Sequence, residues 1–165
     1  MSFKKDLNNF KIREATLDDV DVIYNFIREL AEYEKLLNEI EFSKDELKYS
    51  LFKENNFVSI IIGEYKKNPI GYALYYYNYS TFKAKAGIYL EDLYIIPEMR
   101  NRGYGRALLS YIANIVVINK FSRLEWSVLD WNSNAINLYK SIGSRSLDGW
   151  TIQRLEGQKL IDIAK

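Results

Sequence analysis

Hydrophobic and polar positions follow two different periods along this chain, and the changes of period mark its elements. Short apolar or alternating runs predict strands, whereas apolar residues three or four positions apart predict helices. On this basis we expect a strand at each of seven places, over 10–15, 57–65, 70–77, 85–96, 124–129, 151–155 and 159–163. We place a turn at 67–69 between the second and third strands, and a Glu156-Gly157 turn between the last two.

Four segments with helical spacing lie between these strands. Thr16 and Ser43 are suitable N-terminal caps for the first two helices, and Asn132 or Ser133 is suitable for the last. Gly143 stands where a glycine commonly ends a helix. The resulting order is β-α-α-β-β-β-α-β-α-β-β. It predicts an α/β fold with a mixed sheet and helices on both sides.

Length and charge balance narrow the class of protein. The 165 residues suit one domain, which we expect to span residues 1–165. Twenty-three basic and 22 acidic residues leave a net charge of +1, so no global field favours nucleic acid or an anionic membrane. The chain has no apolar run long enough to span a bilayer and no apolar leader, which favours a cytoplasmic protein.

The composition also limits the available chemistry. Cysteine is absent, which excludes disulfides, thiolate metal sites and a covalent acyl-cysteine intermediate. Histidine is absent too, so the commonest general base and metal ligand are missing. We therefore expect no metal. Catalysis would depend on carboxylates, tyrosines, amines and backbone groups.

One glycine-rich segment carries the clearest chemical signal. Between the strand expected over 85–96 and the helix expected over 107–119, the chain reads Arg100-Asn101-Arg102-Gly103-Tyr104-Gly105-Arg106. A helix N-terminus offers unpaired N–H groups, and glycines let a phosphate approach them. The three arginines add forked donors, so the segment predicts a pyrophosphate site. The simpler alternative is a turn that only starts a helix.

The spacing of this segment points to a particular family. It is neither a P-loop nor the three-glycine dinucleotide fingerprint. Its Arg-x-x-Gly-x-Gly pattern resembles the acetyl-CoA signature of the GNAT acyltransferases, and residues 131–143 resemble that family's second signature. The resemblance implies the GNAT fold and acetyl-CoA as acetyl donor. It also implies cofactor contacts at Leu93, Tyr94, Ile95, the whole segment Arg100 to Arg106, and Asn132.

Acyl transfer to an amine needs a base and benefits from an acid. A lysine-like amine has an ordinary pKa of about 10.4, so it must lose a proton before it attacks. In the second GNAT signature the tyrosine lies beside the thioester sulfur, which makes Tyr139 our candidate acid. The alternative is that Tyr139 only packs with Leu138 and Ile142 on an apolar stripe.

Glu91 and Asp92 interrupt an otherwise apolar strand. Because successive side chains point to opposite faces, at least one carboxylate must face packed structure. Burying an unpaired carboxylate is costly, so we expect either a structural salt bridge or a cleft that attracts an ammonium group. In the second case Glu91 is our candidate to relay the amine's proton, through water.

Beyond the superfamily, the chain resembles the spermidine/spermine (diamine) acetyltransferases over nearly its full length. The matching stretches include Glu29 to Glu34, Tyr89 to Asp92 and Gly149-Trp150. The resemblance implies a homodimer with the amine site near the interface. Together with Asp92, the residues expected to bind the amine are Tyr33, Glu34, Glu91, Glu125, Trp126, Ser127 and Asp148.

Two departures from that pattern leave the acceptor open. Asp148 replaces a longer glutamate, and the Glu125-Trp126-Ser127 strand differs from the diamine enzymes. Related enzymes act on thialysine or other small primary amines. Our hypothesis is an acetyl-CoA-dependent N-acetyltransferase for a small cationic amine, with direct attack in a ternary complex. The alternatives are another amine, such as thialysine, an amino acid or a peptide N-terminus, or a non-catalytic regulator that binds CoA or polyamines.

Overall fold

The computed structural model of the protein describes residues 7–54 and 56–165. The chain forms two compact units, residues 1–129 and 130–165, which we describe one at a time. The strands of the first unit are β1 (Phe10–Glu14), β2 (Ser59–Tyr65), β3 (Asn68–Ser80), β4 (Lys85–Ile95) and β5 (Leu124–Trp126). Its α-helices are α1 (Val20–Glu34), α2 (Lys44–Phe52) and α3 (Tyr104–Ile118), with short 3₁₀ turns at Leu17–Asp19, Leu37–Glu39 and Pro97–Met99.

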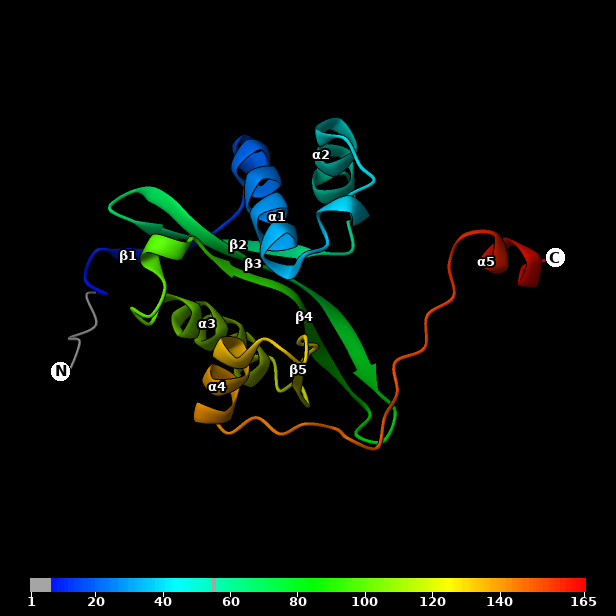
Figure 1. Cartoon of the computed structure of the whole chain (residues 1–165). Helices are drawn as coiled ribbons and strands as arrows, with labels where there is room; N and C mark the ends of the chain where they lie inside the picture. Colours follow the sequence, from blue (N-terminus) through cyan, green and yellow to red (C-terminus); the bar gives the residue numbers. More distant parts are fainter. Residues whose placement is uncertain (1–6, 55) are drawn as a thin grey trace. The chain divides into compact units, whose positions relative to one another are not determined.

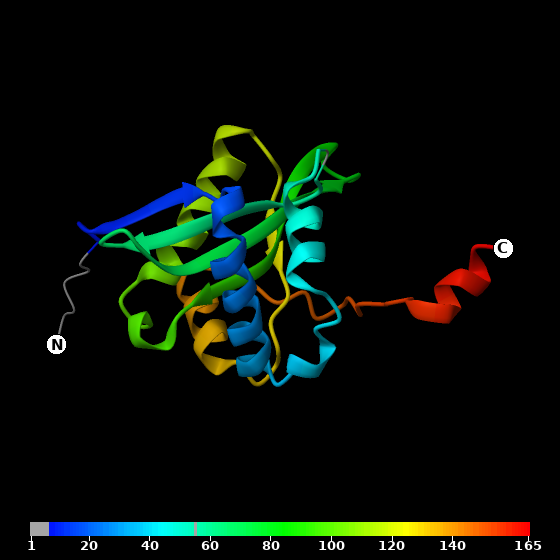
Figure 2. The same cartoon turned by 90° about the horizontal axis from the view of Figure 1, so that it is seen from above.

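The five strands form one mixed sheet. Their order is β1-β2-β3-β4-β5, with antiparallel pairs from β1 to β4 and a parallel pair between β4 and β5. Helices α1 and α2 cover one face of the sheet and α3 covers the other (Figures 1 and 2). The predicted α/β class, with helices on both sides of a mixed sheet, is therefore confirmed.

The core on the α1 side explains why this helix forms and where it lies. Apolar residues such as Ile23 and Phe26 recur at helical spacing and face the sheet, where both are buried. Phe26 stacks on Tyr72 of β3, with ring centroids 5.9 Å apart, and also contacts Tyr94 of β4. The aromatic cluster fixes α1 above the centre of β3 and β4, next to the strand that carries Glu91 and Asp92.

A polar network ties the first strand to the start of α1. Arg13 donates two hydrogen bonds of 2.7 Å to the carboxylate of Asp19 and one of 2.8 Å to Glu64. The backbone N–H of Thr16 donates to the same Asp19 carboxylate at 2.7 Å. Asp19 is only 5% exposed, so these donors are what make its burial tolerable. Ser43 caps α2 as predicted, whereas Thr16 caps the 3₁₀ turn Leu17–Asp19 and the N-cap of α1 is Asp19.

We expect Arg13→Met to lower the free energy of unfolding by about 2 kcal/mol at pH 7, because it strands a buried carboxylate while Arg13 itself is partly exposed. The hydrogen bond from Arg13 lowers the pKa of Asp19 in the folded protein. The wild type should therefore lose this stabilisation as the pH falls below the ordinary aspartate range, and the variant should lose less. Urea unfolding at pH 7 and at about pH 2.5, below the ordinary aspartate pKa of about 3.9, measures both effects.

Lys44→Met is the matched control for that experiment. It removes an ion pair to Asp21 whose two side chains are 47% and 77% exposed, so no measurable change is expected. Equal stability of the Arg13 variant and the wild type would contradict a structural role for the network.

Several element boundaries in the first unit differ from the predicted ones, and three of the differences have a clear structural origin or consequence. The β2–β3 turn is made by Lys66 and Lys67, both with positive φ, and Pro69 lies inside β3 opposite Glu64. A register shift at this point accommodates the proline. Strand β5 ends at Trp126, three residues earlier than predicted. Helix α3 begins at Tyr104, because the glycine segment already forms its first turn.

The second unit contains helices α4 (Ser133–Ser141) and α5 (Gly157–Ile163). Asn132 caps α4 through its side chain, and Gly143 has a φ of +86°, as expected for a glycine after a helix. The two predicted closing strands are wrong: residues 151–155 have no regular structure, and 159–163 lie in α5. The short run Leu160 to Ile163 fits either period, and no strand ladder forms there among the described residues.

The single-domain organisation stays a prediction. Within the described ranges, the structure has no helix with the length and apolarity that crossing a membrane requires. Residues 1–6, where the leader was judged absent, lie outside the described part of the chain.

Candidate functional site

The site is organised by an irregularity in β4. Along the β3–β4 ladder, Leu74 pairs with Asp92 while Tyr75 pairs with Leu90, so Glu91 is an extra residue, a β-bulge. The bulge leaves Glu91 exposed and turns Asp92 toward the packed α1 side. One of the two carboxylates thus faces packed structure, as predicted.

The same bulge changes which amides face the outer edge of β4. Ladder pairing between β4 and β5 ends at Leu90 and Trp126 in the described residues, although β4 continues to Ile95. The N–H of Ile96 donates to Ile70 on the β3 side, so by alternation the amides of Leu93 and Ile95 face the edge beyond β5. These N–H groups form a slot for a chain that can accept hydrogen bonds.

The glycine segment after β4 has the conformation that an anion site requires. Asn101 and Gly103 both have positive φ, of 61° and 91°, and α3 starts immediately afterwards. The first backbone N–H groups of α3 have no partners within the helix. A Cβ built on Gly105 would meet only Ile95, at 3.8 Å, so the backbone there is open to close approach. The backbone of the segment thus has the conformation predicted for a diphosphate site, and binding itself stays a prediction.

Two of the predicted arginines brace the segment itself. Arg100 donates from Nε to the carbonyl of Ile95 at 2.8 Å, and Arg102 donates from Nη2 to the carbonyl of Glu98 at 2.9 Å. Arg106 is exposed on the first turn of α3. The backbone conformation of the segment is therefore supported by its own side chains, and direct contacts from the arginines to a phosphate stay a prediction.

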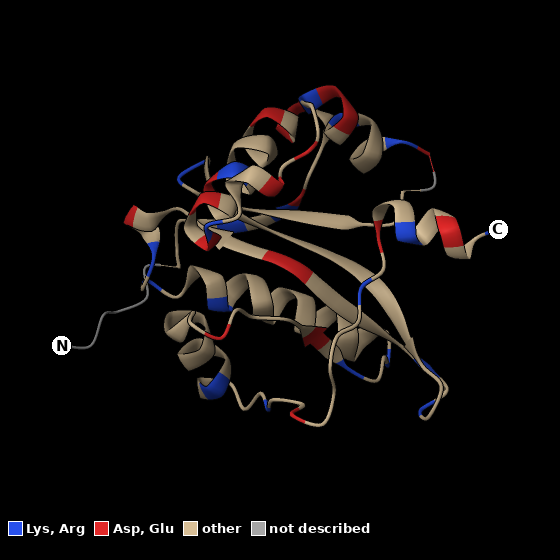
Figure 3. Cartoon of the chain, turned by 45° about the vertical axis from the view of Figure 1, so that its right-hand side comes forward, with Lys and Arg blue, Asp and Glu red and all other residues tan. Residues whose placement is uncertain are grey.

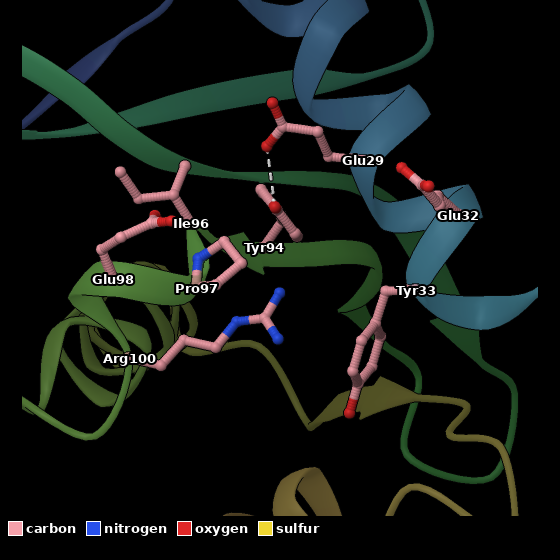
Figure 4. A pocket seen from close by; sticks show the side chains of 8 residues that line it. All are labelled: Glu29, Glu32, Tyr33, Tyr94, Ile96, Pro97, Glu98 and Arg100. Carbon is pink, nitrogen blue, oxygen red and sulfur yellow. Dashed lines mark hydrogen bonds between the residues drawn. The ribbon is translucent and has the colours of Figure 1, made fainter.

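A pocket of about 550 Å³ lies between α1 and the end of β4 (Figure 4). The Arg100 guanidinium lies 4.8 Å from the ring centroid of Tyr33 and 5.4 Å from that of Tyr94, so it links the glycine segment to α1. The hydroxyl of Tyr94 donates a hydrogen bond to the carboxylate of Glu29 at 2.7 Å. Burial raises the pKa of Tyr94, and this hydrogen bond raises it further. The pocket is lined by Glu29, Glu32, Tyr33, Tyr94, Ile96, Pro97, Glu98 and Arg100.

A carboxylate pair lies on the α1 side of β4. Asp92 accepts a 2.8 Å hydrogen bond from the buried hydroxyl of Tyr72, and burial raises the pKa of Asp92 to about 6. Glu34 at the end of α1 is close enough for its charge to raise that pKa further, and burial raises the pKa of Glu34 itself. Neither carboxylate forms an ion pair with a lysine or arginine in the part of the chain that the structure describes. The pair would be stabilised by a cation.

The predicted residues on β5 are engaged locally. Glu125 pairs with Arg123 at 2.8 Å and accepts a hydrogen bond from Asn78 at 2.8 Å. Ser127 shares a 2.6 Å hydrogen bond with Tyr89, and Trp126 is half-buried opposite Leu90. Their predicted contacts with an amine stay predictions, and the carboxylate of Glu125 already has a cationic partner.

The remaining predicted residues belong to the second unit. Asn132 accepts a hydrogen bond from the N–H of Ala135 at 3.2 Å and so fixes the start of α4. Tyr139 is half-buried on α4, two turns after that cap, and Asp148 is exposed in the following loop. Their roles in acid catalysis, pantetheine binding and amine binding stay predictions.

Sequence reasoning missed Tyr72 and Glu29. Both become partners of β4 side chains only through the strand register and the placement of α1, which no local motif encodes. The only hint of these contacts in the sequence is the concentration of tyrosines over 72–79. Among the described residues, no group of three or more acidic, histidine or cysteine side chains is arranged to hold a metal ion.

Comparison with known proteins gives consistent matches. The Acetyltransferase (GNAT) family model matches residues 23–143. Thialysine N-epsilon-acetyltransferase from Bos taurus is 38% identical over 164 residues, covering 93% of this chain and 96% of that protein. Spermidine/spermine N(1)-acetyltransferase-like protein 1 from Homo sapiens is 29% identical over 168 residues, covering 96% of this chain and 24% of that protein. A solved structure of an integron cassette protein from V. cholerae has a TM-score of 0.79 and 26% identity, covering 95% of this chain and 98% of that chain.

Proposed function

The chain belongs to the acetyltransferase (GNAT) family, and from this premise we propose that it transfers an acetyl group from acetyl-CoA to a primary amine of a small polycationic substrate. The family resemblance inferred from its two signatures is confirmed, and the chain is an acetyltransferase. The names of its relatives give a side-chain amine of an amino-acid analogue and a polyamine as acceptors. The finer choice of amine is the subject of the proposal.

The observation that carries the proposal is the carboxylate pair of Asp92 and Glu34. Both groups lie on the α1 side of the sheet and burial raises the pKa of each, while the charges of Glu91 and Glu34 raise the pKa of Asp92 further. Like charges in a partly desolvated place are unfavourable unless a cation joins them. An ammonium group supplies that cation, and a second ammonium on the same molecule would gain from the carboxylates of Glu29 and Glu32, which line the pocket beside α1. Figure 3 marks the acidic and basic positions along the chain.

The donor side is supported by the main chain of the first unit. Acetyl-CoA supplies an acetyl group activated as a thioester. The amides of Leu93 and Ile95 would hold its pantetheine arm, and the N–H groups at the start of α3 would hold its diphosphate. Two observations support this assignment: the β4–β5 ladder ends at Leu90, and a Cβ built on Gly105 would meet Ile95 only at 3.8 Å.

The mechanism follows from the charges around the amine. In the proposal Asp92 and Glu34 bind the ammonium form, and the exposed Glu91 at the bulge takes its proton through water. The free amine then attacks the acyl carbon directly. No cysteine exists in the chain to carry the acetyl group, so transfer does not pass through an acyl-cysteine. Tyr139 gives a proton to the departing sulfur.

A second acceptor class is favoured by the relatives themselves. The Bos taurus protein matches this chain at 38% identity and is named for thialysine, an amino acid, rather than for a polyamine. A panel of spermidine, spermine, putrescine, thialysine, lysine and peptide N-termini separates these classes by kcat/KM. A homodimer, and action in the cytoplasm, are further parts of the proposal, and light scattering of the purified protein tests the first.

We expect Asp92→Asn to raise the KM for the preferred amine by about tenfold or more, because a charge-assisted contact to the ammonium is lost. The KM for acetyl-CoA should change by less than about twofold, since the donor contacts are main-chain groups. Steady-state kinetics with each substrate varied in turn measures both. Asp45→Asn, on the exposed first turn of α2, is the control. Loss of acetyl-CoA binding instead of amine binding would contradict the assignment of the two sides.

A further inference from the structure

The hydroxyl of Tyr72 is a buried polar group beside the proposed amine site that the proposed mechanism does not use. The side chain is fully buried on β3, and its ring is stacked on Phe26 with an interplanar angle of 10°. A phenylalanine would fill the same space without burying a hydroxyl. Because an unsatisfied buried hydroxyl is costly, its single partner matters. That partner is Asp92, at 2.8 Å.

The geometry fixes one half of the Asp92 carboxylate. Tyr72 can only donate to it, because burial raises the pKa of Tyr72 well above its usual value and keeps its proton in place. Oδ2 of Asp92 accepts this hydrogen bond, so Oδ1 of the same carboxylate is left for another group. The backbone on both sides is held by the ladder, since Tyr72 pairs with Tyr94 and Leu74 pairs with Asp92. The carboxylate therefore has one preferred orientation.

The charged and titratable groups around this pair come from three elements. A hydrogen bond donated to a carboxylate stabilises its charged form, so Tyr72 lowers the pKa of Asp92 while burial and the neighbouring acids raise it. The balance keeps Asp92 ionised at neutral pH. The groups that act on the pair are Glu34 from α1 and Glu91 and Tyr94 from β4. Beyond Tyr94 lie its partners Glu29 from α1 and Arg100 from the segment after β4.

We propose that Tyr72 is a positioning residue for the amine acceptor: its hydroxyl orients Asp92, so that the free oxygen of Asp92 and the carboxylate of Glu34 together bind one ammonium group. This inference rests on the proposed function for the identity of the ligand. It assigns the hydroxyl a task that the packing of the ring does not require. It also explains why a polar group is buried beneath the bulge of β4.

Tyr72→Phe tests the inference because it removes the hydroxyl and keeps the ring. Spermidine and thialysine are titrated by calorimetry into the protein saturated with CoA, which measures amine binding without turnover. We expect the affinity for the amine that binds wild type to fall by about tenfold, and the affinity for acetyl-CoA to change by less than about twofold. Tyr75→Phe is the matched control, since Tyr75 is also buried on β3 but pairs opposite Leu90 and bonds to Ser59.

Carbon-detected NMR of labelled aspartate gives a second readout that a merely structural role would not move. Loss of the donated hydrogen bond should raise the pKa of Asp92 above its value of about 6 in the wild type. The acid limb of the pH profile for amine binding should move to higher pH by the same amount. In an Asp92→Asn background, Tyr72→Phe should have no further effect on amine affinity, because its partner no longer ionises.

The outcomes separate the inference from the proposed function. An unchanged Asp92 pKa and unchanged amine affinity in Tyr72→Phe would overturn the inference, even if the wild type acetylates amines. The same tenfold loss in the Asp92→Asn background would also overturn it, because Tyr72 would then act without Asp92. If the wild type acetylates no amine of the panel, the proposed function fails. A selective loss of amine binding in Tyr72→Phe would still support the inference.

Discussion

Tyr139→Phe should lower kcat by about 100-fold while leaving the affinity for acetyl-CoA unchanged, because general acid catalysis contributes only in the transition state. The substitution removes one hydroxyl from a half-buried side chain of α4 and retains the ring. The cap of α4, made by Asn132, is left intact. Single-turnover kinetics, together with equilibrium binding of acetyl-CoA, separates loss of chemistry from loss of binding.

The control for this experiment is Tyr111→Phe, which removes a hydroxyl from a side chain of α3 that is 37% exposed. Its kcat should match that of the wild type. Equal kcat in Tyr139→Phe and the wild type would exclude Tyr139 as the acid. A fall in acetyl-CoA affinity with constant kcat would assign Tyr139 to binding instead.

Gly71→Ala should destabilise the protein by about 3 kcal/mol or more, since overpacking against fixed backbone is among the costliest substitutions. A Cβ on Gly71 would lie 2.2 Å from the carbonyl oxygen of Tyr94 and 2.6 Å from Cδ1 of Ile95. The backbone has no room to yield, because Gly71 pairs directly with Ile95 in the β3–β4 ladder. Urea unfolding measures the loss, with the midpoint and slope compared to those of the wild type.

Gly149→Ala is the matched control, since a Cβ there would meet nothing within 4 Å. Its stability should stay within about 0.5 kcal/mol of the wild type. Because Gly71 lies against the strand that carries the Leu93 and Ile95 amides, Gly71→Ala should also weaken acetyl-CoA binding at temperatures where the variant is folded. A fully stable Gly71→Ala variant would mean that β3 and β4 separate more easily than their ladder indicates.

The parts of the fold that depend on local pattern could be predicted. The caps at Ser43 and Asn132 and the glycine segment before α3 depend on neighbouring residues, and the structure contains each of them. Thr16 caps a 3₁₀ turn that precedes α1 rather than α1 itself. The strands of the sheet could be predicted because each lies in an apolar or alternating run. The closing strands failed because 159–163 is a short apolar run without a strict period, and only a ladder partner would have decided it.

The parts of the site that depend on register could not be predicted. The sequence showed that Glu91 or Asp92 must face packed structure, but the bulge that selects Asp92 is a property of the β3–β4 ladder. The bond from Tyr72 to Asp92 joins residues twenty positions apart through that same ladder. Arg100 was expected to face a phosphate, and its contact with Tyr33 depends on where α1 ends in space. Local motifs carry no information about such encounters.

The bulge at Glu91 has a consequence for how such a protein diverges over evolutionary time. The groups it presents beyond Leu90 are main-chain amides, which every residue except proline possesses, so point mutations seldom delete them. In the proposal, recognition of the amine depends instead on the side chains of Asp92, Glu34 and Tyr72, where a single codon change alters charge or shape. Proteins that share this backbone should therefore keep the same acetyl donor and differ in the amine that they accept. Paralogues would acquire new amine substrates through substitutions at these three side chains, while the backbone of β4 stays the same.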